Sequence, residues 1–165
     1  MAEDTIPRTK RDGTLTFADN AGANTLVVTI EAGDFSWNAP QDKVTNVLDR
    51  GQMGAPPYIR LADEQPMTFS FTGVMRELTD ATDATLMQLL HNGGKVGTGW
   101  VSTMGANGEV DTWSLTWAVE GVAHGSANHT MTLPYCYITG SVKEGDPNII
   151  SISGTSYSRR PTSIS

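Results

Sequence analysis

Residues 111–140, DTWSLTWAVEGVAHGSANHTMTLPYCYITG, decide how the rest of the chain folds. In the first part of this stretch large apolar residues alternate with small or hydroxyl-bearing ones: Trp113, Leu115, Trp117 and Val119 against Thr112, Ser114, Thr116 and Ala118. A period of two residues is typical of a β-strand whose two faces lie in different environments. We therefore predict a long strand that buries its bulky face and exposes its hydroxyl face.

A second strand is expected after a break at residues 121–126. The alternation there places Met131, Leu133, Tyr135 and Tyr137 on one face, and Thr130, Thr132 and Cys136 on the other. The two strands should pair antiparallel, with bulky side chains buried and a carpet of hydroxyls and small groups exposed. Such a surface is smooth and polar, without a pocket of reactive groups. Cys136, the single cysteine, is expected to be a buried small apolar residue.

The rest of the chain predicts a mainly β protein. Further strands are expected at residues 14–17 and 25–30, which form a hairpin, and at residues 35–37, 67–72, 97–104 and 148–154. In the run at residues 67–72, Met67, Phe69 and Phe71 alternate with hydroxyl residues, as in the central pair. With 165 residues and no linker-like stretch, the chain should form one domain, residues 1–165, around one core.

One substantial helix is expected. Thr82 or Asp83 can cap it, its apolar stripe contains Leu86, Leu89 and Leu90, and residues 91–94 end it. The glycine-rich residues 93–99 that follow lack the spacing of a phosphate-binding loop, so a flexible turn is the expected structure.

Three segments carry no secondary-structure pattern: an N-terminal arm at residues 1–11, a long loop at residues 38–59 and a polar C-terminal tail at residues 158–165. The loop contains Pro40, Gly51, Gly54, Pro56 and Pro57. Structureless loops of this length are uncommon in compact domains, and those that occur are usually functional or held by a partner. The loop is therefore a first indication of assembly.

Composition excludes several classes of function. The formal net charge is −7 and the basic residues are scattered, which argues against nonspecific nucleic-acid binding. No apolar run approaches the roughly 20 residues that span a bilayer, and the start lacks a secretion signal, so a cytoplasmic protein without membrane contact is expected. His91, His124 and His129 have no metal-ligand spacing, and no nucleophile and base can be paired. We predict no catalytic, cofactor-binding or metal-binding residue.

The chain resembles the tail tube proteins of tailed bacteriophages. The resemblance covers nearly the whole sequence and consists of short patterns in order: DGTL (12–15), IEAGDFSW (30–37), DRG (49–51), DEQP (63–66) before TFSF (68–71), and EGDPN (144–148) before SISG (151–154). No pattern alone is a chemical motif; the specificity lies in the ordered set.

This resemblance implies a β-sandwich or barrel-like tail tube fold with one flanking α-helix, whose inner sheet closes into a continuous barrel in a hexameric ring. Rings would stack into the tail of the virion, assembled in the cytoplasm of the bacterial host, and DNA would pass through the lumen without specific binding. The implied partners are further copies of the chain and the tail-tip, tape-measure and tail-terminator proteins. The implied role is structural, not enzymatic.

Two sets of site residues follow from this expectation. The lumen should be lined by Ser114, Thr116, Thr130 and Thr132, or by their neighbours of opposite parity. The loop at residues 38–59 should contact the next ring through Arg50, with Asp49 as its local partner and with apolar area from Val47, Leu48, Met53 and Tyr58. The alternative for the loop is that it folds back over the edge of its own sheet.

Other classes of function remain open at this point. A related tube could serve a bacterial secretion or contractile injection machine. A similar sandwich could instead decorate a capsid or act as an adhesin, and an enzyme is the third class. Growth into tubes, binding to capsids or glycans, and turnover of a small ester or sugar would distinguish the three.

Overall fold

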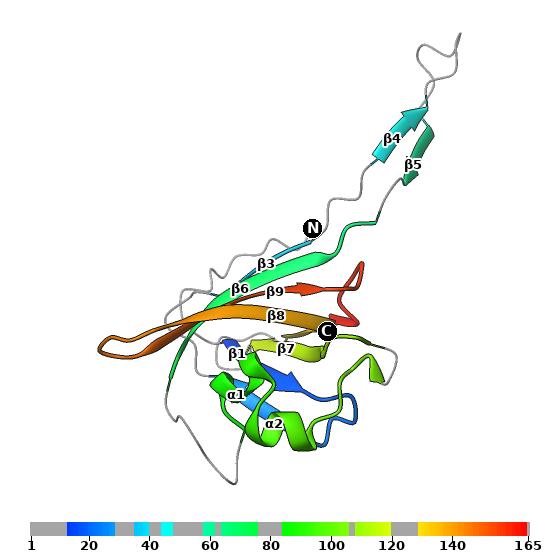
Figure 1. The fold of residues 1–165 in the computed structure, drawn as a ribbon. Coiled ribbons are helices and arrows are strands. Elements are labelled where there is room, and N and C mark those ends of the chain that lie inside the picture. The colour runs from blue at the N-terminus through cyan, green and yellow to red at the C-terminus, as the bar shows by residue number, and fades with distance from the viewer. Residues whose placement is uncertain are drawn as a thin grey trace.

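The computed structural model describes residues 13–28, 35–39, 44–47, 58–61, 64–75, 84–105, 108–119 and 129–164. The predicted arm at residues 1–11 lies outside them. The chain is mainly β, as predicted (Figure 1). Its elements are β1 (Gly13–Ala18), β2 (Thr25–Val28), β3 (Ser36–Asn38), β4 (Val44–Val47), β5 (Tyr58–Leu61), β6 (Met67–Val74), α1 (Leu86–His91), α2 (Gly94–Gly99), β7 (Trp113–Val119), β8 (His129–Lys143), β9 (Ile149–Ser156) and β10 (Ser163–Ile164).

Most of the strands form one antiparallel sheet in the order β2-β1-β7-β8-β9-β6-β3, and β10 pairs with β8. The predicted pairing of the two central strands is confirmed, since β7 and β8 are antiparallel neighbours with Thr116 opposite Thr132. β8 is longer than predicted and serves two neighbours: residues 129–136 pair with β7, and residues 136–143 pair with β9. It therefore joins the two halves of the sheet.

A β-bulge in β8 corrects the predicted faces of this strand. Trp113 lies opposite Cys136 and Leu115 lies opposite Leu133, so β8 carries one more residue than β7 in this interval. Tyr135, within the bulge, has a φ of 52°. An extra residue reverses the alternation beyond it. Cys136 is buried, as predicted, but on the side of Met131 and Leu133 instead of the hydroxyl side. Tyr135 and Tyr137 are exposed, contrary to the prediction.

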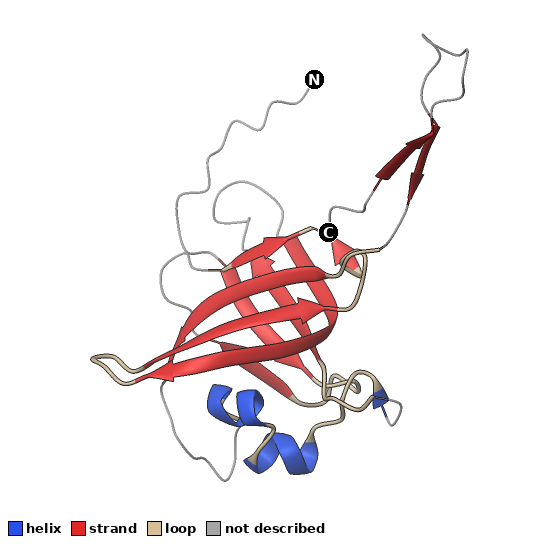
Figure 2. Cartoon of the chain, turned by 45° about the horizontal axis from the view of Figure 1, so that its top comes forward, coloured by secondary structure: helices blue, strands red, loops and turns tan. Residues whose placement is uncertain are grey.

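The sheet curls so that its halves face each other across one core (Figure 2). The rings of Phe17 in β1 and Phe71 in β6 have centroids 6.0 Å apart, although β7, β8 and β9 lie between these strands in the sheet. Phe35 and Trp117 likewise approach to 5.6 Å. Within the described chain the end strands β2 and β3 do not pair with each other. The sandwich or barrel that was expected is thus a single curled, open sheet.

Two short helices cover the core, not one. In α1, the Thr85 hydroxyl accepts a hydrogen bond from the Gln88 amide at 3.3 Å, and Asn92 ends the helix in the left-handed conformation. The cap is therefore Thr85, while the expected caps at residues 82 and 83 lie outside the described chain. Leu89 is buried, and Leu90 packs so closely that a Cβ on Gly140 of β8 would lie 3.1 Å from its Cδ1.

The second helix, α2, replaces a predicted turn and the start of a predicted strand at residues 97–104. Its sequence, GKVGTG, is a poor helix former. Tertiary contact compensates, because Val96 is completely buried in the core. Trp100 follows directly and packs edge-on against Trp113, with ring centroids 5.5 Å apart. Burial of one valine and one tryptophan thus outweighs local propensity here.

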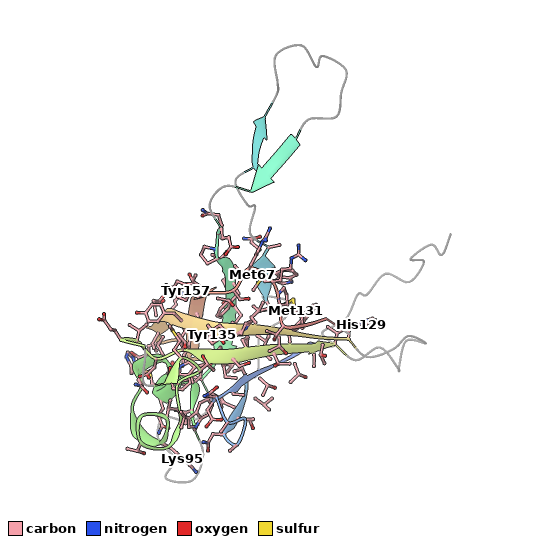
Figure 3. The ribbon with its side chains drawn as sticks, turned by 90° about the vertical axis from the view of Figure 1, so that its right-hand side faces the viewer. Met67, Lys95, His129, Met131, Tyr135 and Tyr157 are labelled. Atoms are coloured by element: carbon pink, nitrogen blue, oxygen red, sulfur yellow. The ribbon has the colours of Figure 1, made fainter. Side chains whose placement is uncertain are left out.

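The segment at residues 38–59 is not structureless, which corrects the predicted long loop. β4 and β5 pair antiparallel as a separate two-stranded sheet, with Val44 opposite Leu61 and Val47 opposite Tyr58. Figures 1 and 3 show these strands projecting away from the curled sheet, at the opposite end from α1 and α2. The alternative, in which the segment covers its own sheet edge, does not hold for β4 and β5.

The C-terminal segment is also more ordered than the polar tail expected at residues 158–165. β10 pairs with β8, placing Ser163 opposite Thr132 and Ile164 opposite Met131. The Thr162 amide donates to the Thr132 carbonyl oxygen at 2.9 Å. This segment continues the β9 side of β8 past the point where β9 ends.

Candidate functional site

The most distinctive surface of the protein is the outward face of β3, β6, β9 and the second half of β8. We call it the hydroxyl face, and it consists of Ser36, Asn38, Thr68, Ser70, Thr72, Tyr137, Thr139, Ser141, Ser151, Ser153 and Thr155. It forms because each strand alternates: Met67, Phe69 and Phe71 point into the core while their neighbours point out, and Ile150 and Ile152 do the same in β9.

The side chains of this face stand in rows across the strands. Ser36 lies opposite Ser70, Ser70 opposite Ser153, and Ser153 opposite Thr139, so one row crosses four strands. Ser36 and Ser70 share a hydrogen bond of 2.8 Å between their hydroxyl oxygens, and Thr139 and Ser153 share one of 3.2 Å. Because hydroxyls both donate and accept, such a row partly satisfies itself. The hydroxyls of this polar surface therefore need few hydrogen bonds from another molecule.

The rows of this face from Ser36 to Ser141 carry no formal charge. β3, β6 and β9 contain no Asp, Glu, Lys or Arg, and in β8 the one such residue is Lys143, which ends the strand on the same side as Thr139 and Ser141. The net charge of −7 therefore arises elsewhere in the chain. Affinity for nucleic-acid phosphates comes mainly from Lys and Arg, and repulsion from Asp and Glu. The hydroxyl face supplies neither.

The face is also hollowed. One shallow hollow lies over the middle of the three strands β6, β9 and β8, and is lined by Ser70, Thr72, Thr139, Ser141 and Ser151 among others. A second lies beside it toward β3, where Tyr137 and Tyr157 join the lining. The sheet leaves no room for a side chain at Gly154, because a Cβ there would lie 2.7 Å from Cε1 of Phe69 and 2.8 Å from the Tyr137 carbonyl oxygen.

The four residues predicted to line a lumen lie together, but on the other half of the sheet. Thr116 and Thr132 are cross-strand partners with hydroxyl oxygens 3.1 Å apart, and Thr130 lies opposite Ala118. Ser114 follows along the same face of β7, opposite Ala18 of β1. All four are half-buried. They form a hydroxyl patch beside the first half of β8, smaller than the hydroxyl face.

Of the predicted inter-ring residues, only Val47 and Tyr58 lie in the described chain. They face each other across the β4–β5 pair at its outer end. Leu48, Asp49, Arg50 and Met53 lie outside the described residues, so their contacts stay predictions.

The sequence patterns did not predict the larger hydroxyl face, because the patterns of β8 and β9 do not show that the two strands are neighbours. The signal was present: Ser151 and Ser153 alternate with Ile150 and Ile152, and Thr139 and Ser141 continue the hydroxyl pattern of β8 after the bulge. Only the cross-strand register, with Thr139 opposite Ser153, shows that these residues belong to one surface.

The described part of the chain brings together no group of three or more His, Cys, Asp or Glu side chains that could hold a metal ion. Nor does any helix within the described ranges have the length and apolar character needed to cross a membrane. Burial raises the pKa of the Cys136 thiol to about 12, so this residue is protonated at neutral pH. The thiol donates to the Leu133 carbonyl oxygen at 3.2 Å, in keeping with a structural role.

Asp19 is the one buried carboxylate of the described chain, 4% exposed, and it organises the turn between β1 and β2. It accepts hydrogen bonds from the Asn24 side chain at 2.8 Å and from the Ala23 amide at 3.1 Å. Burial alone would raise its pKa, but these hydrogen bonds together hold it below the usual value. Asn24 also donates to the Gly99 carbonyl oxygen, tying the turn to α2.

Comparison with known proteins adds no relative. No protein-family model matches the chain, and no curated protein matches it significantly.

Proposed function

We propose that this chain is the building block of a bacteriophage tail tube, polymerising as stacked hexameric rings with the hydroxyl face turned toward the lumen. The observation that carries the proposal is the absence of charge from the hydroxyl rows, Ser36 to Ser141, of a hollowed face that spans four strands. A conduit for DNA needs a wall that neither retains nor repels phosphates, and rows of mutually bonded hydroxyls meet that need.

The edges of the hydroxyl face support ring closure. β3 is the last strand on one side, and on the other side residues 137–143 of β8 have no second neighbour within the described chain. Unpaired edges of this kind are templates for pairing with another chain. Successive pairings in the order β3-β6-β9-β8 are all antiparallel, so β3 and β8 run in opposite directions. β8 of one copy can therefore pair antiparallel with β3 of the next.

This arrangement differs in one respect from the expectation drawn from the sequence. The lumen-facing residues become Ser70, Thr139 and Ser153 with their rows, instead of Ser114, Thr116, Thr130 and Thr132. In the proposal the latter four lie on the half of the sheet that contains β1 and β7, away from the closing barrel.

Electron microscopy of the purified protein at rising concentration tests the proposal. We expect rings and then hollow tubes with a regular axial repeat. Val142→Lys, which places a charge on the open edge of β8, should remain folded but stop ring closure. Val27→Lys serves as the matched control, because Val27 is 62% exposed and lies in β2, at the other end of the sheet. A wild-type protein that stays monomeric at high concentration would exclude the proposal.

A second candidate function has one specific observation in its favour. Tyr137 and Tyr157 line a hollow together with Asn38 and Ser153, and aromatic residues with a few polar groups are typical of small-ligand sites. This combination would suit a sugar-binding module such as an adhesin. Binding to a glycan array that is lost in Tyr157→Ala, by a protein that forms no tubes, would favour this candidate.

A further inference from the structure

The two hollows of the hydroxyl face join into one trough. The hollow over β6, β9 and β8, which we call the serine hollow, has a volume of about 480 Å³, and the tyrosine hollow beside it, toward β3, has a volume of about 570 Å³. Ser70, Thr139 and Ser153 line both, so the hollows meet at the row that these residues form. Each volume lies in the range of about 300–1,000 Å³ that is usual for small-ligand sites.

The trough runs along the strands. On the β9 side its lining extends from Ser151 in the serine hollow to Tyr157 in the tyrosine hollow. This stretch of chain spans about 20 Å at the usual rise of about 3.3 Å per residue. A ligand that fills both hollows is therefore long and extended, with several linked units.

Tyrosine rings stand at one end of the trough. Tyr137 is 38% exposed and Tyr157 is 58% exposed, and both line the tyrosine hollow. Tyr137 lies opposite Thr155, two residues before Tyr157, so the two tyrosines are diagonal neighbours across β8 and β9. A tyrosine ring offers a flat apolar surface together with a hydroxyl that hydrogen-bonds. Sugars have the same two properties, since a ring face of C–H groups is bordered by hydroxyls.

Tyr135 adds a third exposed ring beside this end of the trough. Its φ of 52° is a left-handed conformation that is uncommon for a tyrosine. The Tyr157 amide donates to the Tyr135 carbonyl oxygen at 3.2 Å, which ties the strained bulge to a residue that lines the trough (Figure 3). Strained residues of this kind cluster at functional sites. A smooth conduit for DNA gives no reason for exposed aromatic rings on a strained bulge.

The lining favours an uncharged ligand. Of the described residues that line the trough, none is charged at neutral pH, and Lys143 is not among them. A charged ligand would lose water without gaining an ion pair. The serine and threonine hydroxyls and the Asn38 amide both donate and accept hydrogen bonds, which matches a ligand that carries many hydroxyls.

We propose that the trough binds an uncharged polysaccharide chain of the straight, β-1,4-linked type. One unit stacks on Tyr137 and Tyr157, and the units that follow hydrogen-bond to the row of Ser70 and Ser153 and then reach Ser151. A β-1,4-linked chain is flat and extended, as the trough requires, whereas an α-1,4-linked chain coils. The inference deepens the second candidate function, the sugar-binding module, and rests on it.

Calorimetric titration of the unassembled protein with oligosaccharides of two lengths tests the inference. The probes are cellohexaose and N-acetylated chitohexaose, two uncharged β-1,4-linked chains, each beside its own disaccharide. At least one hexasaccharide should bind about tenfold or more tightly than its disaccharide, because one or two additional hydrogen bonds supply that difference. Coiled maltohexaose and negatively charged hexagalacturonate should bind about tenfold or more weakly than the better chain.

Variants locate the two ends of the bound chain. Tyr157→Ala should weaken hexasaccharide and disaccharide alike by about tenfold, whereas Tyr157→Phe keeps the ring and should bind nearly as wild type. Ser151 is exposed and lines the serine hollow, so Ser151→Trp should fill that hollow and reduce hexasaccharide affinity to that of the disaccharide. Thr25→Trp adds the same ring at an exposed position of β2 and is the matched control, with unchanged binding.

The outcomes separate this inference from both candidate functions. Equal affinity for hexasaccharide and disaccharide, lost in Tyr157→Ala, would leave a sugar site and overturn the chain. Unchanged hexasaccharide binding by Ser151→Trp, or preference for hexagalacturonate, would also overturn it. If no oligosaccharide binds, the inference and the sugar-binding module both fail, while tube formation is decided separately by electron microscopy. Circular dichroism of each variant shows whether lost binding is lost folding.

Discussion

Placing a positive charge in the middle of the hydroxyl face should turn a non-binding wall into one that retains DNA. Ser153 is the best position, because it is exposed, lies in the row with Ser70 and Thr139, and lines both hollows. Ser153→Lys should cost little stability, since exposed substitutions of this kind usually change the free energy of unfolding by about 0.5 kcal/mol or less. Assembly into tubes should therefore be preserved.

The size of the effect follows from counterion release. Each lysine that neutralises one phosphate contributes about 0.9 to the slope of log affinity against log salt. If all six lysines of one hexameric ring contact phosphates, raising the salt from about 50 to about 200 mM should weaken DNA retention about a thousandfold. The wild-type wall, in whose strands Lys143 at the end of β8 is the one Lys, Arg, Asp or Glu, should show a much weaker dependence.

The assay is the rate of DNA ejection from particles whose tails contain the variant, measured across this range of salt. We expect Ser153→Lys to stall at low salt and to recover as salt rises, while the wild-type rate changes little. Ser153→Gln, long and polar but uncharged, separates charge from bulk and should eject normally. Wild-type ejection by Ser153→Lys particles at low salt, from intact tails, would refute the assignment of this face to the lumen.

Three further predictions concern the fold that supports the site. Gly154→Val should lower the free energy of unfolding by about 1–3 kcal/mol in urea titrations, because the new Cβ would press on the Phe69 ring and the Tyr137 carbonyl; a change within about 0.5 kcal/mol would contradict this. Asp19→Ala should cost about 1–3 kcal/mol at neutral pH. Because hydrogen bonds hold the folded pKa of Asp19 below its ordinary 3.8, its stabilisation is complete above that pH and is lost as the pH falls through the folded value, so the difference between wild type and Asp19→Ala in thermal melts should shrink below pH 3.8. Cys136, with its pKa raised to about 12, should resist iodoacetamide at pH 8 in the native protein and react once urea unfolds it; fast native labelling would show that the β8 bulge opens readily.

Alternation predicted the strands of this protein well and their faces less well. For β6 the pattern gave both the strand and its buried side, since Phe69 and Phe71 are buried, and for β9 it gave the strand, in which Ile150 and Ile152 are buried. In β8 the alternation gave the wrong faces beyond Pro134, because one inserted residue reverses a pattern with a period of two. Tyr135, within the bulge, takes a left-handed φ that the sequence does not require. The exposure of Tyr137 and the burial of Cys136 both follow from that single residue.

Segments held by tertiary contact were the least predictable. α2 contains three glycines and forms around buried Val96, and β10 exists because β8 offers it an edge. β4 and β5 were not predicted, because prolines and glycines lie close to them in the sequence. Their own sequences, VTNV and YIRL, are nevertheless rich in strand-forming residues. The hydroxyl face required the register between strands far apart in sequence, which pattern analysis of single strands does not provide.

The distribution of charge gives the proposed tube two different surfaces. β3, β6 and β9 contain no acidic residue, so in the proposed tube these strands add no negative charge to the lumen. Each copy carries a net charge of −7, so neighbouring tubes repel one another. In the proposed tube, attraction is then confined to the open edges of β3 and β8. Such a protein grows along one axis and does not bundle, which is the behaviour that a tail requires.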